Sequence, residues 1–180
     1  MEWVLGPEAR KSSQIAIKMI KRLLKTGFDK ETSLELINST ISLNTEEDMY
    51  ATLDIMVFDL YSGNMELIKN GACPTFIKTK EGVKVVKSES LPAGIVNELD
   101  MTVYDKDIND GDIIVMCSDG IIESNSEYEN KEQWVINILD EIKISNPQKI
   151  ADIIIKEAID NNYGIAKDDM TIFVGRIKKN

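Results

Sequence analysis

The sequence lacks histidine altogether and contains only two cysteines. Without histidine the chain cannot form a Ser-His-Asp or Cys-His nucleophile system, a histidine-ligated zinc site or a histidine general base. Cys73 and Cys117 lie far apart and form no Cys-x-x-Cys pair, so we interpret both as buried, reduced thiols of an intracellular protein. These absences exclude the histidine-dependent classes of hydrolase.

The sequence also lacks an excess of basic residues and has no long hydrophobic run. Its 21 Lys and Arg against 31 Asp and Glu give a formal net charge of -10, which disfavours a nucleic-acid partner. No apolar stretch approaches the roughly 18 residues that a membrane span needs, and no basic leader opens a signal peptide. We therefore expect a cytoplasmic fragment without membrane contact. The one basic cluster, at 18–25, is typical of the solvated face of an amphipathic helix.

What is present suffices for one globular domain over residues 1–180, because 43% of the 180 residues are hydrophobic. Apolar periodicity, Gly27 as a helix end and Asp29 as a helix cap predict two adjacent helices first. Hairpin-like strands follow, then a second helix pair and a last strand, which is the order of an α+β layered domain. The expected elements are helices at 7–27, 29–41, 131–144 and 147–160, and strands at 50–60, 65–69, 75–78, 83–87, 99–105, 112–117 and 170–177.

Two expected strands have carboxylates at their ends. The apolar run at 113–116 leads into Ser118, Asp119 and Gly120, and Asp168 and Asp169 open the last strand. Carboxylates gathered at strand ends are a plausible way to bind a hard divalent cation. Alone, each signal is weak, because Asp-Gly after a strand is usually a turn and acids before a strand often only protect an edge.

The ordered set of blocks is more specific than its parts. It resembles the metal-dependent PP2C-class serine/threonine protein phosphatases, and among them the phosphatase domains of the stage II sporulation protein E family. The resemblance covers about residues 6–177. The blocks that carry it are Ala-Thr-Leu-Asp at 51–54, Asp-Leu-Tyr-Ser-Gly at 59–63, Gly-Ala-Cys-Pro-Thr-Phe-Ile at 71–77, Ser-Leu-Pro-Ala-Gly-Ile at 90–95, Met-Cys-Ser-Asp-Gly-Ile-Ile-Glu at 116–123 and Asp-Asp-Met-Thr at 168–171.

The resemblance implies a PP2C-like α-β-β-α sandwich of two antiparallel sheets flanked by helices. It also implies two Mn²⁺ or Mg²⁺ ions and a water, made more acidic by the metals, that attacks a phosphoserine. By this resemblance Asp119 and Asp168 are metal ligands, Asp169 and Ser118 are supporting residues, and Gly120 lets the backbone turn close to the site. No side chain is assigned a catalytic role of its own.

The resemblance also implies a biological setting. The substrate would be a phosphorylated anti-anti-sigma factor, whose dephosphorylation releases a sporulation sigma factor in the forespore. The full-length family protein is tethered to the membrane at the sporulation septum.

The chain departs from the family pattern at its start. The family has Asp-Gly-Met-Gly ahead of the first helix, with an Asp that bridges both metals, whereas residues 1–5 here read Met-Glu-Trp-Val-Leu. We expect an N-terminally truncated, partial phosphatase domain that lacks the first strands and has an incomplete metal site. An exposed sheet edge would favour self-association. The alternatives are a catalytically inactive regulatory or binding module that uses its first two helices, and an α+β domain whose acids have no function.

Overall fold

The computed structural model describes residues 7–43, 50–59, 61–125 and 129–179. The chain divides into two compact units. The first consists of Met1–Ile55, Leu67–Ala72 and Ser88–Val103, and the second of Met56–Glu66, Cys73–Lys87 and Tyr104–Asn180. The prediction of a single domain over residues 1–180 stays a prediction.

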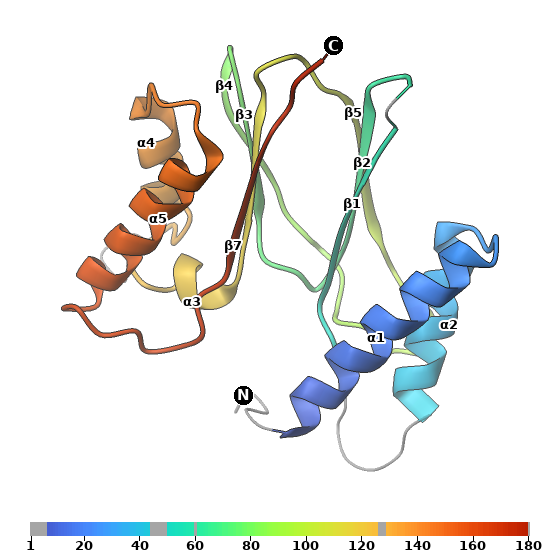
Figure 1. Ribbon diagram of the computed structural model, residues 1–180. Helices are drawn as coiled ribbons and strands as arrows, with labels where there is room; N and C mark the ends of the chain where they lie inside the picture. Colours follow the sequence, from blue (N-terminus) through green and yellow to red (C-terminus); the bar gives the residue numbers. More distant parts are fainter. Residues whose placement is uncertain (1–6, 44–49, 60, 126–128, 180) are drawn as a thin grey trace. The chain divides into compact units, whose positions relative to one another are not determined.

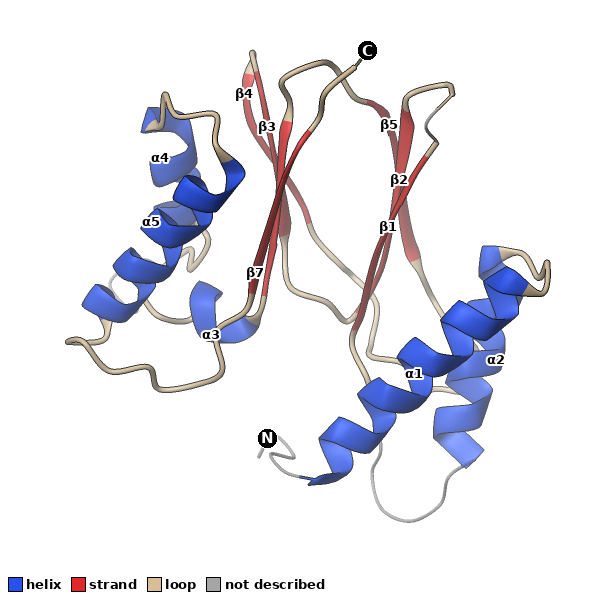
Figure 2. Cartoon of the chain, in the orientation of Figure 1, coloured by secondary structure: helices blue, strands red, loops and turns tan. Residues whose placement is uncertain are grey.

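The described residues form helices and two antiparallel sheets in the order that the sequence predicts, with one additional short helix, α3, after β6 (Figures 1 and 2). The strand orders are β1-β2-β5 in one sheet and β4-β3-β6-β7 in the other. Within these residues, no helix is both long and apolar enough to span a membrane. The elements are α1 (Pro7–Lys25), α2 (Lys30–Leu43), β1 (Leu53–Phe58), β2 (Asn64–Asn70), β3 (Thr75–Thr79), β4 (Gly82–Val86), β5 (Thr102–Asp107), β6 (Ile113–Cys117), α3 (Asp119–Ile122), α4 (Gln133–Glu141), α5 (Pro147–Asn161) and β7 (Ile172–Arg176).

The first unit is built around the helix pair α1 and α2. Gly27 ends α1 with a φ of 93°, and the carboxylate of Asp29 caps α2 by accepting the backbone N–H of Thr32 at 2.8 Å. Both signals were predicted from the sequence and are confirmed, as is the exposed basic face at 18–25. The buried apolar side chains of this core are Ala16, Leu34, Ile37, Ile41, Ala51, Ile68 and Ala93.

The second unit packs α4 and α5 against the sheet β4-β3-β6-β7. Pro147 occupies the first turn of α5, and Asn146 caps that helix by accepting the N–H of Lys149 at 3.0 Å. Lys78 of β3 donates to backbone carbonyls at the end of α4, including that of Ile142 at 2.8 Å. Its buried core comprises Phe76, Ile113, Val115, Ile121, Ile122, Trp134, Val135, Leu139, Ile150, Ile154 and Ala158.

Three local predictions need correction. Strand β5 covers Thr102–Asp107 rather than 99–105, because Leu99 and Met101 pack against the first core from irregular backbone ahead of the strand. Helix α4 ends at Glu141, since the next residue already has an extended backbone. Cys73 and Cys117 form no disulfide, as expected, but they are half-buried at the edge of the second core rather than buried.

Candidate metal site

The candidate site begins where β6 ends. Ser118 is extended, with φ −76° and ψ 166°, and the chain then enters the short helix α3 at Asp119. The sequence alone favoured a turn here, but the Glu123 N–H donates to the Asp119 carbonyl at 2.8 Å and closes a helical turn. The Asp119 side chain is exposed and accepts the Gly120 N–H at 3.0 Å. A buried strand thus delivers one carboxylate to the surface.

Ser118 joins this strand end to the segment that opens β7. Its N–H donates to the Thr171 carbonyl at 2.9 Å, and its Oγ accepts the Thr171 N–H at 2.9 Å. The same Oγ donates to the Asp169 carbonyl at 3.0 Å. These three bonds continue the antiparallel pairing of β6 with β7, in which Cys117 faces Ile172. The two acidic segments of the sequence are therefore fixed side by side.

Gly120 makes the closest approach between the two segments. A Cβ atom built on Gly120 would lie 2.6 Å from the Asp169 carbonyl oxygen and 3.2 Å from the Cβ of Asp168. No side chain fits at such distances, so the contact requires glycine at this position. Asp168 in turn accepts the N–H of Asp169 at 2.7 Å, which holds its carboxylate beside the backbone.

A cavity of about 250 Å³ lies next to this junction. Two charged residues on its wall, Glu123 and Lys167, differ in whether they have an ion-pair partner. Glu123 is paired with Lys131 at 2.7 Å, whereas Lys167, among the residues that the structure describes, has no ion-pair partner. The lining residues are Gly120, Glu123, Ser124, Asn162, Lys167 and Asp168.

The donor chemistry of Asp119 and Asp168 fits a hard divalent cation, because both offer carboxylate oxygens at an exposed surface. The number of donors does not reach a full set. Within the described ranges, no group of three or more His, Cys, Asp and Glu side chains could hold a metal ion. Residues 1–5, where the sequence departs from the Asp-Gly-Met-Gly pattern of the family, lie outside the described residues.

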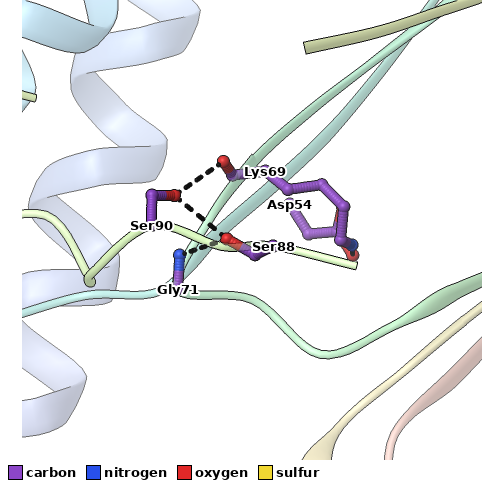
Figure 3. Close-up of polar contacts among 5 residues, drawn as sticks. All are labelled: Asp54, Lys69, Gly71, Ser88 and Ser90. Carbon is purple, nitrogen blue, oxygen red and sulfur yellow. Dashed lines mark hydrogen bonds and ion pairs between the residues drawn. The ribbon is translucent and has the colours of Figure 1, made fainter. Parts of the chain in front are cut away.

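The first unit contains a buried ion pair that was not predicted from the sequence. Lys69 of β2 is 0% exposed, and its Nζ lies 2.7 Å from Oδ2 of Asp54 in β1. Figure 3 shows this pair together with Ser88 and Ser90, whose hydroxyls lie 3.0 Å apart. The Ser88 Oγ accepts the Gly71 N–H at 2.9 Å. A lysine that shares a face of its strand with an apolar residue, two positions after Leu67, was the available signal.

Comparison with known proteins identifies relatives over almost the whole chain. A family profile for stage II sporulation protein E (SpoIIE) matches residues 6–178. Stage II sporulation protein E of Bacillus subtilis (strain 168) is 37% identical over 175 residues, which cover 97% of this chain and 21% of that protein. The protein of the same name from Priestia megaterium is 33% identical over 97% of this chain and 30% of its own length. The chain thus spans less than a third of these relatives.

Solved structures agree with these matches. The PP2C phosphatase domain of the cell fate determinant SpoIIE from Bacillus subtilis, solved with a fragment of its regulatory domain, superimposes with a TM-score of 0.86 at 36% identity, covering 96% of this chain and 51% of that chain. The manganese-presoaked phosphatase domain of the same protein gives a TM-score of 0.71 at 33% identity, covering 100% of this chain and 78% of that chain. The predicted PP2C-like fold class is confirmed. The chain belongs to the stage II sporulation protein E family, and it matches the PP2C-type phosphatase domain of that family.

Proposed function

We propose that this chain is a divalent-metal-dependent protein serine phosphatase. The observation that supports the proposal is the junction at Ser118 and Gly120, where the segment after β6, which carries Asp119, lies against the segment before β7, which carries Asp168. Family membership and the match to the PP2C phosphatase domain support the same activity.

Each residue of the junction has a distinct part in the proposed site. Asp119 and Asp168 would hold Mn²⁺ or Mg²⁺ through their carboxylates. When bound, such an ion supplies a Lewis acid that neutralises phosphoryl charge and makes an attacking water more acidic. Ser118 fixes the separation of the two strand ends through its three hydrogen bonds, and Gly120 leaves the space that the Asp169 carbonyl occupies. Asp169 supports the site through its backbone, because its N–H holds the Asp168 carboxylate.

We further propose the substrate and setting that the family resemblance implies. The substrate is a phosphorylated anti-anti-sigma factor, and its dephosphorylation activates a sporulation sigma factor. The reaction takes place in the cytoplasm. What supports this assignment is membership of a sporulation family over residues 6–178.

The experiment that tests the activity measures phosphate release from a phosphoserine protein with MnCl₂ and with EDTA. Asp119→Asn and Asp168→Asn remove ligand charge with little change of shape, and each is expected to lower the rate at least about a hundredfold. Asp140→Asn, at an exposed acid of α4, serves as the matched control and should keep the wild-type rate. Equal rates in all four proteins would rule out the proposed ligands.

A second candidate function is a binding module with the same fold and no turnover. The observation in its favour is that the described residues contain no group of three metal-ligating side chains. Such a module would bind a phosphoserine protein and release no phosphate under saturating Mn²⁺. Measured turnover that disappears in Asp119→Asn would exclude it.

A further inference from the structure

The segment between α5 and β7 leaves the helix through an unusual turn. Tyr163 has a φ of 56° and Gly164 a φ of 80°, so two consecutive residues are left-handed. Their N–H groups donate to the carbonyls of Asp160 and Ile159, at 3.0 and 2.9 Å, and this closes the end of α5. The left-handed region is uncommon for a residue with a large side chain and persists where the surroundings impose it. The direction in which this segment leaves the helix is therefore defined by backbone hydrogen bonds.

This turn exposes large side chains on the approach to the candidate site. Tyr163 is 92% exposed and Ile165 is 66% exposed, whereas Asn162, which directly precedes Tyr163, is buried. Figure 1 shows the chain between α5 and β7 passing α3. Asp168 belongs to this stretch, and its Cβ lies 3.2 Å from where a Cβ on Gly120 of α3 would be. Tyr163 and Ile165 thus expose an aromatic and a β-branched side chain to water on a constrained turn that leads to the candidate site. Exposed apolar side chains of this kind commonly contact a partner.

Lys167 adds a cation at the inner end of the same segment. It lines the cavity that Asp168 and Gly120 also line. Among the described residues it has no ion-pair partner, while the other charged residue on that wall besides Asp168, Glu123, is neutralised by Lys131. An unpaired ammonium group next to a candidate metal ligand suits a phosphate dianion, which accepts charge-assisted hydrogen bonds.

We propose that residues 162–167 form the surface on which a phosphoserine protein docks. Lys167 contacts the phosphoryl group, and Tyr163 and Ile165 contact apolar side chains that flank the phosphoserine. The cavity of about 250 Å³ has room for little more than the phosphorylated side chain. The rest of the partner therefore lies outside the cavity, where Tyr163 and Ile165 offer exposed apolar surface. This inference rests on the proposed function and adds to it a specificity for apolar residues beside the phosphoserine.

The test compares binding and turnover in the same set of proteins. Binding is measured by the fluorescence anisotropy of a labelled peptide that carries a non-hydrolysable phosphonate analogue of phosphoserine between leucines. Turnover is measured with the matching phosphoserine peptide and with p-nitrophenyl phosphate, which is too small to reach Tyr163. The variants are Lys167→Met, Tyr163→Asn and Ile165→Ser. Asparagine is chosen at position 163 because it tolerates the left-handed backbone there. The matched controls are Lys149→Met at the other end of α5 and Tyr61→Asn at an equally exposed tyrosine.

The expected results separate the two kinds of contact. Tyr163→Asn and Ile165→Ser weaken peptide binding and raise the peptide KM about fivefold to tenfold, and they leave p-nitrophenyl phosphate turnover unchanged. Lys167→Met raises the KM about fivefold for both the peptide and p-nitrophenyl phosphate. The controls behave as wild type.

Two different failures can be told apart. A wild-type protein that binds the phosphonate peptide but releases no phosphate contradicts the proposed activity and leaves the docking surface standing. The same peptide with an unmodified serine serves as the reference for binding. If the wild-type protein binds the phosphonate and serine peptides equally, or if all variants bind like wild type, the docking surface is overturned.

Discussion

At the scale of single residues, Gly120 carries the closest packing of the candidate site. An added Cβ would lie 2.6 Å from a backbone oxygen of Asp169, and a backbone atom cannot move aside as a flexible side chain can. We expect Gly120→Ala to lower the free energy of unfolding by about 1–3 kcal/mol and to reduce phosphate release.

Gly175→Ala provides the matched control, because its added Cβ would meet only the ring of Phe173, at 3.2 Å, and that ring is half exposed. Urea unfolding of both variants measures the difference. A cost for Gly120→Ala no larger than that for Gly175→Ala would show that the contact with Asp169 is not tight.

The second residue-scale prediction concerns pH. The backbone N–H and the hydroxyl of Thr32 both donate to the Asp29 carboxylate at 2.8 Å, and they lower the pKa of Asp29 from its usual value of 3.8. Because the pKa in the folded state is below that in the unfolded state, the charged form stabilises the protein above the unfolded pKa. This contribution is lost as the pH falls through the folded pKa.

Asp29→Ala should therefore destabilise the protein at pH 7 and have a smaller effect at pH values below the folded pKa. Asp29→Asn keeps a helix cap and removes the titration. Urea unfolding of wild type and both variants, at pH 7 and at a pH below the folded pKa, measures the free energies of unfolding that check this. A stability difference between wild type and Asp29→Ala that does not shrink on acidification contradicts the assignment.

At the scale of secondary structure elements, the buried pair of Lys69 and Asp54 links β2 to β1. Removing one partner of a buried ion pair leaves the other charge without compensation, which typically costs about 3–5 kcal/mol. We expect a loss of this size for Lys69→Met. The double variant Asp54→Leu/Lys69→Met should recover much of it.

The surface pair of Lys131 and Glu123 provides the comparison. Both of its side chains are more than half exposed, so Lys131→Met should cost less than about 1 kcal/mol. Denaturant unfolding of all three variants decides the matter. A cost for Lys69→Met as small as that for Lys131→Met would mean that the pair adds little to the sheet.

The elements also show what local sequence signals can predict. Helix α5 was predicted almost to its ends, because Asn146 and Pro147 are start signals that act within one turn. Strand β5 was shifted, because Leu99 and Met101 meet a core that the local pattern does not reveal. Helix α3 was missed, since Ser-Asp-Gly favours a turn locally and the contact of Gly120 with Asp169 links distant parts of the chain.

At the scale of the whole molecule, the sequence named the candidate ligands but not what fixes them. Acids at the ends of two predicted strands were a weak signal, and the resemblance to the PP2C class implied that Asp119 and Asp168 are the ligands. The hydrogen bonds of Ser118 that bring these ends together depend on the pairing of β6 with β7, which no local pattern specifies. Lys167 was not predicted for a similar reason, because the cavity that it lines is built from α3, the end of α5 and the approach to β7 together.

We propose that Asp119 and Asp168 hold the divalent ion of a serine phosphatase. Calorimetric titration of Mn²⁺ into the chain and its variants measures this binding without relying on turnover. We expect saturable binding to wild type and Asp140→Asn, and affinity at least about tenfold weaker in both Asp119→Asn and Asp168→Asn. Equal Mn²⁺ affinity in all four proteins would contradict it.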